Sequence, residues 1–413
     1  MDLVVVLEQR FERTPSGVWS HGAFDYLFWN RYLHVFDRVR IVARVRDLKT
    51  PSPGAIKSSG PGISFSEIPY YKGPLQYATR SRAVRRALRN CVQPGDAVIL
   101  RVPSQLAITI APVLNHDEHP YAVEVVGNPH DVFAPGGVKH PLRPFFRWWF
   151  SRELRRQCKG AAAAAYVTES TLQRQYPCPG YVTHYSSITL DDDGFVKGPR
   201  SFEPTKQQHH LILVGSLDQL YKGPDLLIEA VRALVAHGRD LYLTIVGDGS
   251  YRPLLEQQVV DAGLVDRVRF TGVLPAGSAV RDALDRADVF VLPSRTEGLP
   301  RAMIEAMARG LPCIGTAVGG IPELLPADDL VPTSDAVALA SRIDEVITNP
   351  ARMRAMSERN LATARDYHSD VLSERRLAFY THLRQVTEDW TAARGRTGNP
   401  LTRGNVRPRN QSP

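Results

Sequence analysis

Short apolar runs alternate with longer amphipathic stretches along most of the chain. In the first half, each apolar run predicts a strand, and each stretch with apolar residues every three or four positions predicts a helix. This alternation is typical of a parallel, doubly wound α/β sheet. The strands are expected at Leu3–Leu7, Val39–Ala43, Ala97–Leu100, Tyr121–Val126 and Ala163–Val167, and the helices at Asp25–Val35, Ser81–Asn90, Ser104–Asn115, Pro144–Lys159 and Ser170–Tyr176.

The second half repeats the pattern more regularly and predicts a second Rossmann-like sheet. In such a sheet, ligands bind at the carboxyl ends of the strands. The strands are expected at Leu211–Val214, Leu241–Val246, Val268–Thr271, Val289–Leu292 and Pro312–Gly315, and the helices at Pro224–His237, Pro253–Ala262, Ala279–Ala287 and Arg301–Arg309. Residues 336–390 are expected to be helical.

A chain of 413 residues is longer than a domain with a single hydrophobic core usually is, so two domains are expected. The segment between them is rich in turn-forming residues, and the end of the chain has little apolar surface to bury. We predict an N-terminal domain over residues 1–190, a linker over 191–208, a C-terminal domain over 209–370, a further helix over 371–390 and a disordered basic tail over 391–413.

Composition narrows the class of protein. The hydrophobic content of 43% is typical of a globular protein, and no apolar run is long enough to span a membrane. The apolar run at the N-terminus is too short for a signal peptide and predicts a first strand. The four cysteines have no paired spacing, which predicts reduced thiols in a cytoplasmic protein, with neither a zinc site nor a disulfide framework.

The net charge of +8 is unevenly distributed. Residues 1–200 hold 26 basic and 17 acidic side chains, whereas residues 201–390 hold 20 basic and 26 acidic ones. A basic first half predicts contact with an anionic acceptor or surface. Nucleic acid is not an expected partner, because the chain has no helix-turn-helix, RNA-binding or zinc-finger pattern.

Two glutamates, Glu297 and Glu305, stand eight positions apart on either side of the turn Gly298-Leu299-Pro300. Proline suits a first helical turn, so the pattern places Glu297 just before a helix and Glu305 about two turns inside it. The free N–H groups of a helix N-terminus attract phosphate. One ligand could therefore set a diphosphate at this N-terminus, a sugar against Glu297 and a ribose against Glu305. Such a ligand is a nucleotide sugar; a surface helix with incidental acids is the alternative.

The E-x7-E element, with the following GLPCIGTAVGGIPELL, resembles the donor site of retaining glycosyltransferases of family 4. The resemblance is strong over Leu211–Leu325 and looser over residues 1–200. It implies the α/β GT-B fold, in which two Rossmann-like, doubly wound domains face each other across a cleft and the last helix crosses back to the first domain. It also implies a retaining, metal-independent hexosyltransferase that uses a nucleoside diphosphate sugar and no cofactor, in polysaccharide or glycoconjugate biosynthesis.

The resemblance assigns residues to the donor. Lys222 would offset the diphosphate charge. Ser216 stands where the family has an arginine, so that role does not carry over; either another basic group such as Arg301 replaces it, or the leaving group is held more weakly. The expected donor-binding residues are Gly22, Gly215, Ser216, Gly247, Asp248, Gly249, Thr271, Gly272, Val273, Gly298, Leu299, Pro300 and Glu305.

Three side chains are expected to carry the chemistry. Glu297 would orient the sugar, Lys222 would hold the leaving group, and His130, with Asp131 beside it, would reach the donor sugar. A structural loop histidine is the alternative for His130. No general base is evident, and the departing diphosphate can take the acceptor proton.

The run Asp191-Asp192-Asp193 is similar to the Asp-x-Asp pair with which GT-A glycosyltransferases bind a divalent metal ion. It lies in the expected linker, upstream of the better donor site, so a solvated turn and metal-independent activity are predicted.

Residues 144–159 combine five aromatic side chains with several arginines, and a second basic cluster follows one face of the expected helix at 81–90. Such a helix could lie on an anionic membrane surface. The alternative is that the aromatic side chains pack in the core of the domain. The protein is thus expected in the cytoplasm, with the cytoplasmic membrane face as a candidate location.

The acceptor is left open as a glycan, a glycolipid or a small metabolite. Three other functions stay open as well: a nucleotide-sugar epimerase, a pseudo-glycosyltransferase and a regulatory protein that binds a nucleotide sugar without transfer. The transferase would release sugar to a hydroxyl acceptor, whereas the last two would not.

Overall fold

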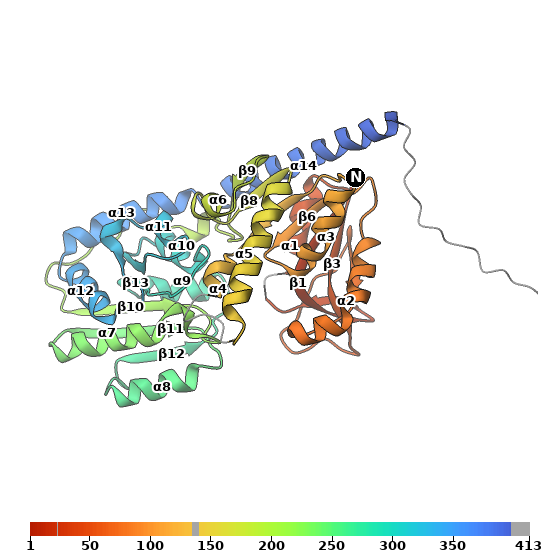
Figure 1. Ribbon diagram of the computed structural model, residues 1–413. Coiled ribbons are helices and arrows are strands. Elements are labelled where there is room, and N and C mark those ends of the chain that lie inside the picture. Colours follow the sequence, from red (N-terminus) through yellow and green to blue (C-terminus); the bar gives the residue numbers. More distant parts are fainter. Residues whose placement is uncertain (23, 134–139, 398–413) are drawn as a thin grey trace, which may run out of the picture.

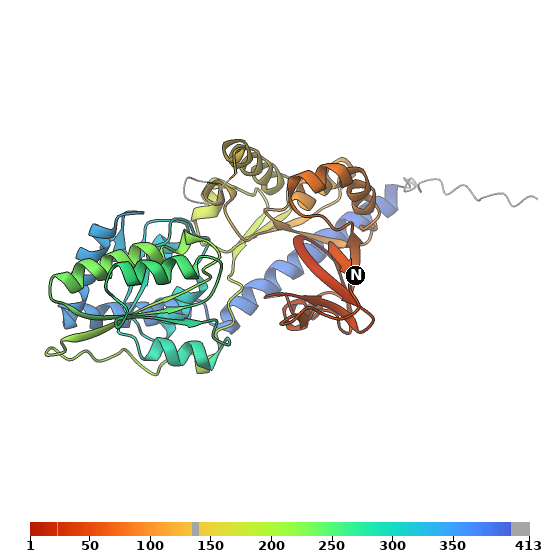
Figure 2. The same ribbon diagram turned by 90° about the horizontal axis from the view of Figure 1, so that it is seen from below.

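The computed structural model describes residues 1–22, 24–133 and 140–397. Two α/β domains lie next to each other, and the long helix α14 (Ser369–Thr397) runs from the C-terminal domain across the N-terminal one (Figures 1 and 2). The predicted architecture of two mainly parallel sheets is confirmed. Within the described part of the chain, no helix is long and apolar enough to cross a membrane.

The N-terminal sheet is mainly parallel but carries an antiparallel edge. Strand β1 lies at its centre, parallel to β3 and β6, and antiparallel to β2. The five predicted strands are present, whereas β2, β4, β5 and β9 were not predicted because they are short or have many polar residues. The strands are β1 (Asp2–Thr14), β2 (Gly17–Ser20), β3 (Arg38–Asp47), β4 (Ile56–Lys57), β5 (Ile63–Ile68), β6 (Ala97–Val102), β7 (Ala122–Val125), β8 (Ala163–Tyr166) and β9 (Tyr181–His184).

Side-chain alternation along β1 explains how both faces of this sheet are covered. Leu3 belongs to the core that includes Tyr380 of α14, whereas Val4 belongs to the core under α2 and α3. The predicted helix at 25–35 is divided into α1 and a 3-10 turn, with Asp25 capping α1 through the Phe28 N–H at 2.8 Å. The helices are α1 (Tyr26–Asn30), α2 (Gly73–Arg89), α3 (Gln105–His116), α4 (Pro129–Val132), α5 (Arg143–Gly160) and α6 (Thr171–Gln175).

The C-terminal sheet is fully parallel, with the strand order β12-β11-β10-β13-β14-β15. Strand order reverses next to β10, so the loops after β10 and β13 open a crevice at the carboxyl edge. The predicted elements are present, with shifted ends. They are β10 (Gln208–Val214), β11 (Asp240–Val246), β12 (Val268–Gly272), β13 (Val289–Leu292), β14 (Cys313–Thr316), β15 (Leu330–Val331), α7 (Pro224–Ala236), α8 (Arg252–Asp261), α9 (Ser278–Asp285), α10 (Arg301–Ala308), α11 (Ile321–Leu324), α12 (Ala336–Ile347) and α13 (Pro350–Arg365).

Helix α14 ties the C-terminal end of the chain to the N-terminal domain. The rings of Tyr380 and Tyr32 lie 4.8 Å apart, and Arg384 donates to the carbonyl oxygen of Val35 at 2.5 Å. The helix continues to Thr397, so the expectation that disorder begins at residue 391 is wrong for 391–397. The remaining residues of the expected tail, 398–413, lie outside the described part of the chain.

Candidate functional site

Two glycine loops meet where β10 and β11 end. The Gly215 N–H donates to Val246 at 2.9 Å, and the Leu217 N–H donates to Asp248 at 2.9 Å. Gly247 has a φ of +139°, and an added Cβ would collide with the carbonyl oxygen of Gly215. Only glycine therefore fits at this position, where the two loops pack backbone to backbone.

Ser216 does not supply a cation at this edge, and its hydroxyl is already engaged. It donates to the Asp218 carboxylate at 3.1 Å and accepts from the Asp218 N–H at 3.2 Å. The neighbouring Asp248 carboxylate accepts from the Gly249 N–H at 2.8 Å and from Arg252 at 3.0 Å. These contacts lower the pKa of Asp248, with the Gly249 N–H as the larger cause.

Lys222 and Glu297 form an ion pair, although 75 positions separate them. Only 12% of the Lys222 side chain and 7% of the Glu297 side chain are exposed. Ser294, in the loop after β13, donates to the same Glu297 oxygen at 3.2 Å. Two residues expected to hold opposite parts of a donor thus neutralise each other, since either charge alone would be costly to bury.

Helix α10 begins at Arg301, after an extended Pro300, and no side chain caps it. The first N–H groups of this eight-residue helix are therefore without side-chain acceptors and suit a phosphate. The expectation that Glu305 lies about two turns inside the helix is wrong. Glu305 is the fifth helical residue, little more than one turn in, because the segment from Glu297 to Pro300 is not helical.

Glu305 faces a cleft of about 840 Å³ between the two domains. Burial raises the pKa of Glu305, while the charges of Arg301 and Arg281 act in the opposite direction. The Arg301 side chain has no hydrogen bond and no ion pair within 4 Å among the described residues, and its charge acts on Glu305. Both domains line the cleft. The N-terminal domain contributes Gly22, Asp25, Phe28 and Arg31, the C-terminal domain contributes Gly277, Arg281, Arg301 and Glu305, and α14 contributes Arg376.

The sequence analysis did not identify Arg31 and Arg376 as cleft residues. Arg31 stacks on Phe28, with its guanidinium carbon 3.8 Å from the ring centroid, and Arg376 donates to the carbonyl oxygen of Ser186 at 2.8 Å. Neither residue lies in a motif, and they come together because the 3-10 turn Arg31–His34 packs against α14. The cleft therefore contains more positive charge than the linear sequence indicated.

The loop after β14 packs against the loop that contains Glu297. Gly319 has a φ of +54°, and a Cβ there would collide with the carbonyl oxygen of Glu297. The Gly320 N–H donates to the Gly298 carbonyl at 2.6 Å. A Cβ on Gly298 would lie 3.7 Å from the carbonyl oxygen of Val126 at the end of β7, so this loop packs directly against the N-terminal domain.

Glu323 joins the domains in a way that the sequence analysis did not predict. Its carboxylate accepts backbone N–H groups from Glu169 at 2.6 Å, Ser170 at 3.0 Å and Thr171 at 2.6 Å, at the start of α6. Partial burial acts to raise the pKa of Glu323, but hydrogen bonds from Thr171, Glu169 and Ser170 outweigh it, and the net pKa is lowered. The contact links the donor loops directly to the N-terminal domain.

His130 lies on α4 rather than on the cleft. Its backbone N–H donates to Asn128 at 3.1 Å, its Nδ1 lies 3.2 Å from Asp131, and Arg147 donates to its carbonyl oxygen at 2.8 Å. No hydrogen bond joins His130 to Lys222 or another expected donor residue in the described part of the chain. Asp131 does accompany it, as expected, whereas Arg147 was not anticipated.

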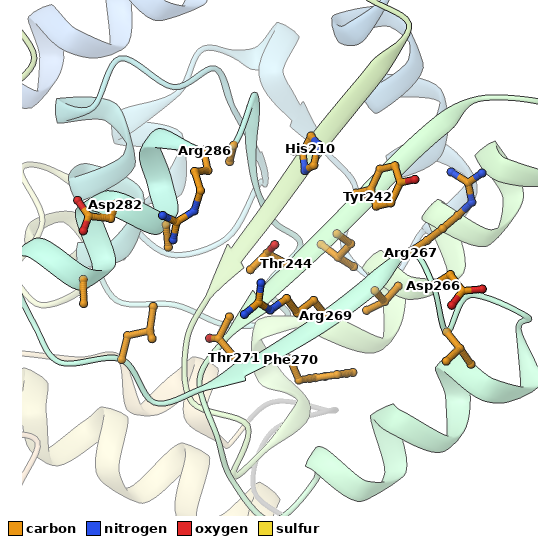
Figure 3. A pocket seen from close by; sticks show the side chains of 17 residues that line it. His210, Tyr242, Thr244, Asp266, Arg267, Arg269, Phe270, Thr271, Asp282 and Arg286 are labelled. Carbon is orange, nitrogen blue, oxygen red and sulfur yellow. The ribbon is translucent and has the colours of Figure 1, made fainter.

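A separate groove of about 1200 Å³ covers the open face of β10, β11 and β12 (Figure 3). Thr271 points into this groove beside Thr244 and Arg269, so only its backbone remains available to a donor in the cleft. Val273 follows and is 75% exposed. Helix α9 separates the groove from the cleft, and no residue lines both.

The aspartate run forms part of a short 3-10 turn. Asp192 lies 3.2 Å from His368, and Asp193 accepts from Arg281 at 2.8 Å. Among the described residues, no three acidic, histidine or cysteine side chains gather in a way that could hold a metal ion.

Comparison with known proteins adds a family context. Residues 208–349 match the family described as glycosyl transferases group 1. Protein CapJ of Staphylococcus aureus is 27% identical over 398 residues, which cover 96% of this chain and 99% of CapJ. The putative colanic acid biosynthesis glycosyltransferase WcaL of Salmonella typhimurium is 37% identical over 177 residues, 41% of this chain and 43% of WcaL. The solved structure of sucrose-phosphate synthase from Thermosynechococcus elongatus shares the fold, with a TM-score of 0.65 and 18% identity over 95% of this chain and all of that one.

Proposed function

We propose that this group 1 nucleotide-sugar glycosyltransferase with the GT-B fold transfers a hexose, with retention and without a metal, to an acceptor hydroxyl. One observation carries the donor assignment: Glu305 faces the interdomain cleft in the same short helix whose uncapped N-terminus follows Glu297. Free N–H groups suit a diphosphate, and a carboxylate one turn further along suits ribose hydroxyls.

Arg301 is our candidate for the cation that Ser216 does not supply. It begins α10, lines the cleft with Glu305 and has no ion pair of its own. Lys222 contacts Glu297, four residues before Arg301. A diphosphate between Arg301 and Lys222 would draw Lys222 away from Glu297, because a dianionic group competes well for an ammonium ion. Glu297 is then released to accept hydrogen bonds from the sugar.

The proposed transfer needs no protein base. The bond between the anomeric carbon and the phosphate oxygen breaks, the acceptor oxygen bonds on the same face, and the departing phosphate oxygen takes the acceptor proton. The protein supplies position and charge stabilisation through Lys222, Arg301 and the α10 N-terminus. His130 is proposed to contact the sugar from the N-terminal side.

The remaining donor residues are proposed to act through their backbones. Gly247 and Gly249 let the loops after β10 and β11 pack backbone to backbone. With domain boundaries at 190 and 208, we propose that acceptor and donor bind on separate sheets. Names such as that of WcaL favour a role in polysaccharide biosynthesis, with a glycan or glycolipid acceptor. A cytoplasmic location, on or near the membrane face, fits this role.

The binding step is tested by thermal unfolding of the protein with a panel of nucleotide sugars, since a ligand that binds only the folded state raises its stability. At least one member of the panel should raise the melting temperature of the wild type and not that of Glu305→Ala. Glu229→Ala is the matched control, because Glu229 is exposed on α7 of the same domain. A pseudo-glycosyltransferase would bind a member of the panel but release no sugar to a hydroxyl.

A further inference from the structure

The N-terminal half of α5 is not part of a core. None of its five aromatic side chains, residues 145, 146 and 148–150, is buried, and Phe145 and Trp148 are 51% and 56% exposed. The buried residues of α5 come later, from Ser151 to Cys158. The alternative that these aromatic residues are buried in the core of the domain is therefore wrong, and the apolar surface of Phe145 and Trp148 has no cover among the described residues.

One side of this half-helix closes an apolar cavity of about 580 Å³. Phe133 and Phe150 stack at 5.6 Å between ring centroids, and Tyr71 and Tyr77 form the opposite wall at 5.2 Å. The walls come from α2, α4 and α5 and the loop after β6. The main aromatic lining residues are Tyr71, Tyr77, Phe133, Phe146, Trp149 and Phe150.

The two charged side chains that line this cavity, Glu8 and Arg44, form an ion pair. Glu8 accepts from Tyr71 at 2.7 Å and from the Leu106 N–H at 3.1 Å, and Arg44 lies 3.1 Å from the same carboxylate. Because the Glu8 carboxylate already has these partners, it needs no hydrogen bond from a ligand. The cavity thus suits a hydrocarbon group, which gains free energy by leaving water.

The other side of the same half-helix forms a cationic groove of about 670 Å³. Four arginines line it and no acidic residue does. Arg143 has no ion pair or hydrogen-bonded side-chain partner among the described residues. Arginine presents a planar fork of donors that matches phosphate oxygens. The arginines are Arg143, Arg147, Arg152 and Arg155.

The apolar cavity and the cationic groove meet at Phe133, which lines both. Pro129 lines the cavity and His130 lines the groove, so the segment after β7, which includes α4, borders both. The first residue of that loop, Val126, is the one whose carbonyl oxygen approaches Gly298 of the donor loop. Figure 1 shows α4 and α5 together on the side of the N-terminal domain that faces the C-terminal one.

We propose that α5 holds a lipid phosphate acceptor, with its hydrocarbon chain in the aromatic cavity and its phosphate in the arginine groove. This assignment deepens the proposed function and rests on it for the role as acceptor. A sugar attached to the phosphate would extend past His130 toward the donor loop. Because one helix borders both an apolar cavity and a cationic groove, the site favours an amphiphile over a free sugar or a free phosphate.

The test is calorimetric titration with farnesyl phosphate below its micelle concentration, without donor. The wild type should bind it at least about tenfold more tightly than farnesol or inorganic phosphate, since each half adds contacts. Phe146→Asn with Trp149→Gln should weaken the binding about tenfold. Arg143→Gln with Arg152→Gln should remove the preference over farnesol.

The matched control is Arg85→Gln with Arg89→Gln, which removes the same charge from exposed positions on α2. Equal loss in this control, or binding to anionic phosphatidylglycerol vesicles but not to monomeric farnesyl phosphate, would overturn the assignment. Thermal unfolding of each variant checks that it is folded. If farnesyl phosphate binds as described but no nucleoside diphosphate is released, the proposed transfer reaction is wrong and the lipid phosphate site is supported. If nucleoside diphosphate is released but farnesyl phosphate does not bind, the lipid phosphate site is wrong and the transfer reaction is supported.

Discussion

Glu323 and Thr171 are hydrogen bonded across the two domains, with 2.6 Å between the Glu323 carboxylate and the Thr171 N–H. The carboxylate belongs to α11, which follows the loop that supports the donor site, and the N–H belongs to the last helix before β9 of the N-terminal sheet. Two further N–H groups join the same carboxylate. The width of the cleft therefore depends on this side chain.

Replacing Glu323 with Gln should favour a more open molecule, because an amide accepts these hydrogen bonds less strongly than a carboxylate. Each hydrogen bond to a charged group contributes roughly 1.5–3 kcal/mol, and partial exposure of Glu323 reduces that figure here. Small-angle X-ray scattering should report a larger radius of gyration. Glu169→Gln is the control, since the Glu169 side chain is exposed and only its backbone joins the contact. Identical scattering from all three proteins would contradict the assignment.

The same contact should depend on pH. The pKa of Glu323 is lowered in the folded protein, so the contribution of this carboxylate to stability is fully present above its unfolded pKa of about 4.3 and is lost as the pH falls through the folded value. The wild type should thus lose its advantage over Glu323→Gln in the free energy of unfolding as the pH is lowered below about 4.3. A difference between the two that stays constant down to pH 2 would be inconsistent with this origin.

Glu305→Ala should weaken the binding of the cognate nucleoside diphosphate by about 1.5–3 kcal/mol, because ribose hydroxyls lose a charged acceptor. Burial raises the pKa of Glu305, so the carboxylate takes up a proton at a higher pH than an exposed glutamate. Wild-type affinity should therefore begin to fall on the acid side before that of an exposed site would, and Glu305→Gln should lack this dependence. Calorimetry measures both, and an unchanged affinity in Glu305→Ala would rule out the ribose contact.

Activity should persist in chelator. Changing Asp191, Asp192 and Asp193 together to Asn should leave most of the turnover in place, since Asp192 and Asp193 already contact His368 and Arg281. The assay is release of nucleoside diphosphate in excess EDTA, with and without added magnesium. Strict dependence on the added metal would be incompatible with a donor site built on Lys222 and Arg301.

The exposed aromatic residues of α5 should bring the protein to anionic membranes. The wild type should sediment with phosphatidylglycerol vesicles at low ionic strength and detach as salt is added, because screening shortens the reach of surface charge to roughly 8–10 Å. Arg152, Arg155 and Arg156 changed to Gln should weaken sedimentation, while donor hydrolysis remains. Arg147 is left intact because it bonds His130. No sedimentation at low salt would exclude this surface interaction.

Local sequence patterns predicted much of the fold. Alternation of apolar residues identified β1, whose Leu3 and Val4 serve opposite faces, and the turn after Glu297 identified the start of α10. Strand β5 was not predicted because Ser64, Ser66 and Glu67 interrupt its apolar pattern, although it pairs with β3. The sequence also left open whether the aromatic residues of α5 are buried, since a pattern does not show whether another element covers an apolar face.

The candidate site was predicted where it depends on short spacing and missed where it depends on tertiary contact. Glu297, Glu305 and Lys222 stand in recognisable loops, although their ion pairing needs the fold. Glu323 and Arg376 act across the domain boundary, 152 or more residues from their partners. No local pattern could have identified them.

The most direct test of the account compares wild type with Glu297→Ala in two quantities: the rate of nucleoside diphosphate release from the nucleotide sugar that stabilises the protein, and the affinity for the nucleoside diphosphate itself. Glu297 is placed on the sugar and not on the nucleotide, so its loss should reduce release by about a hundredfold or more, equivalent to roughly 2.7 kcal/mol, while the affinity changes by only a few fold. Glu229→Ala should match the wild type in both. An absence of release by the wild type with every donor and a lipid phosphate acceptor present, or an equal loss of release and affinity in Glu297→Ala, would contradict the account.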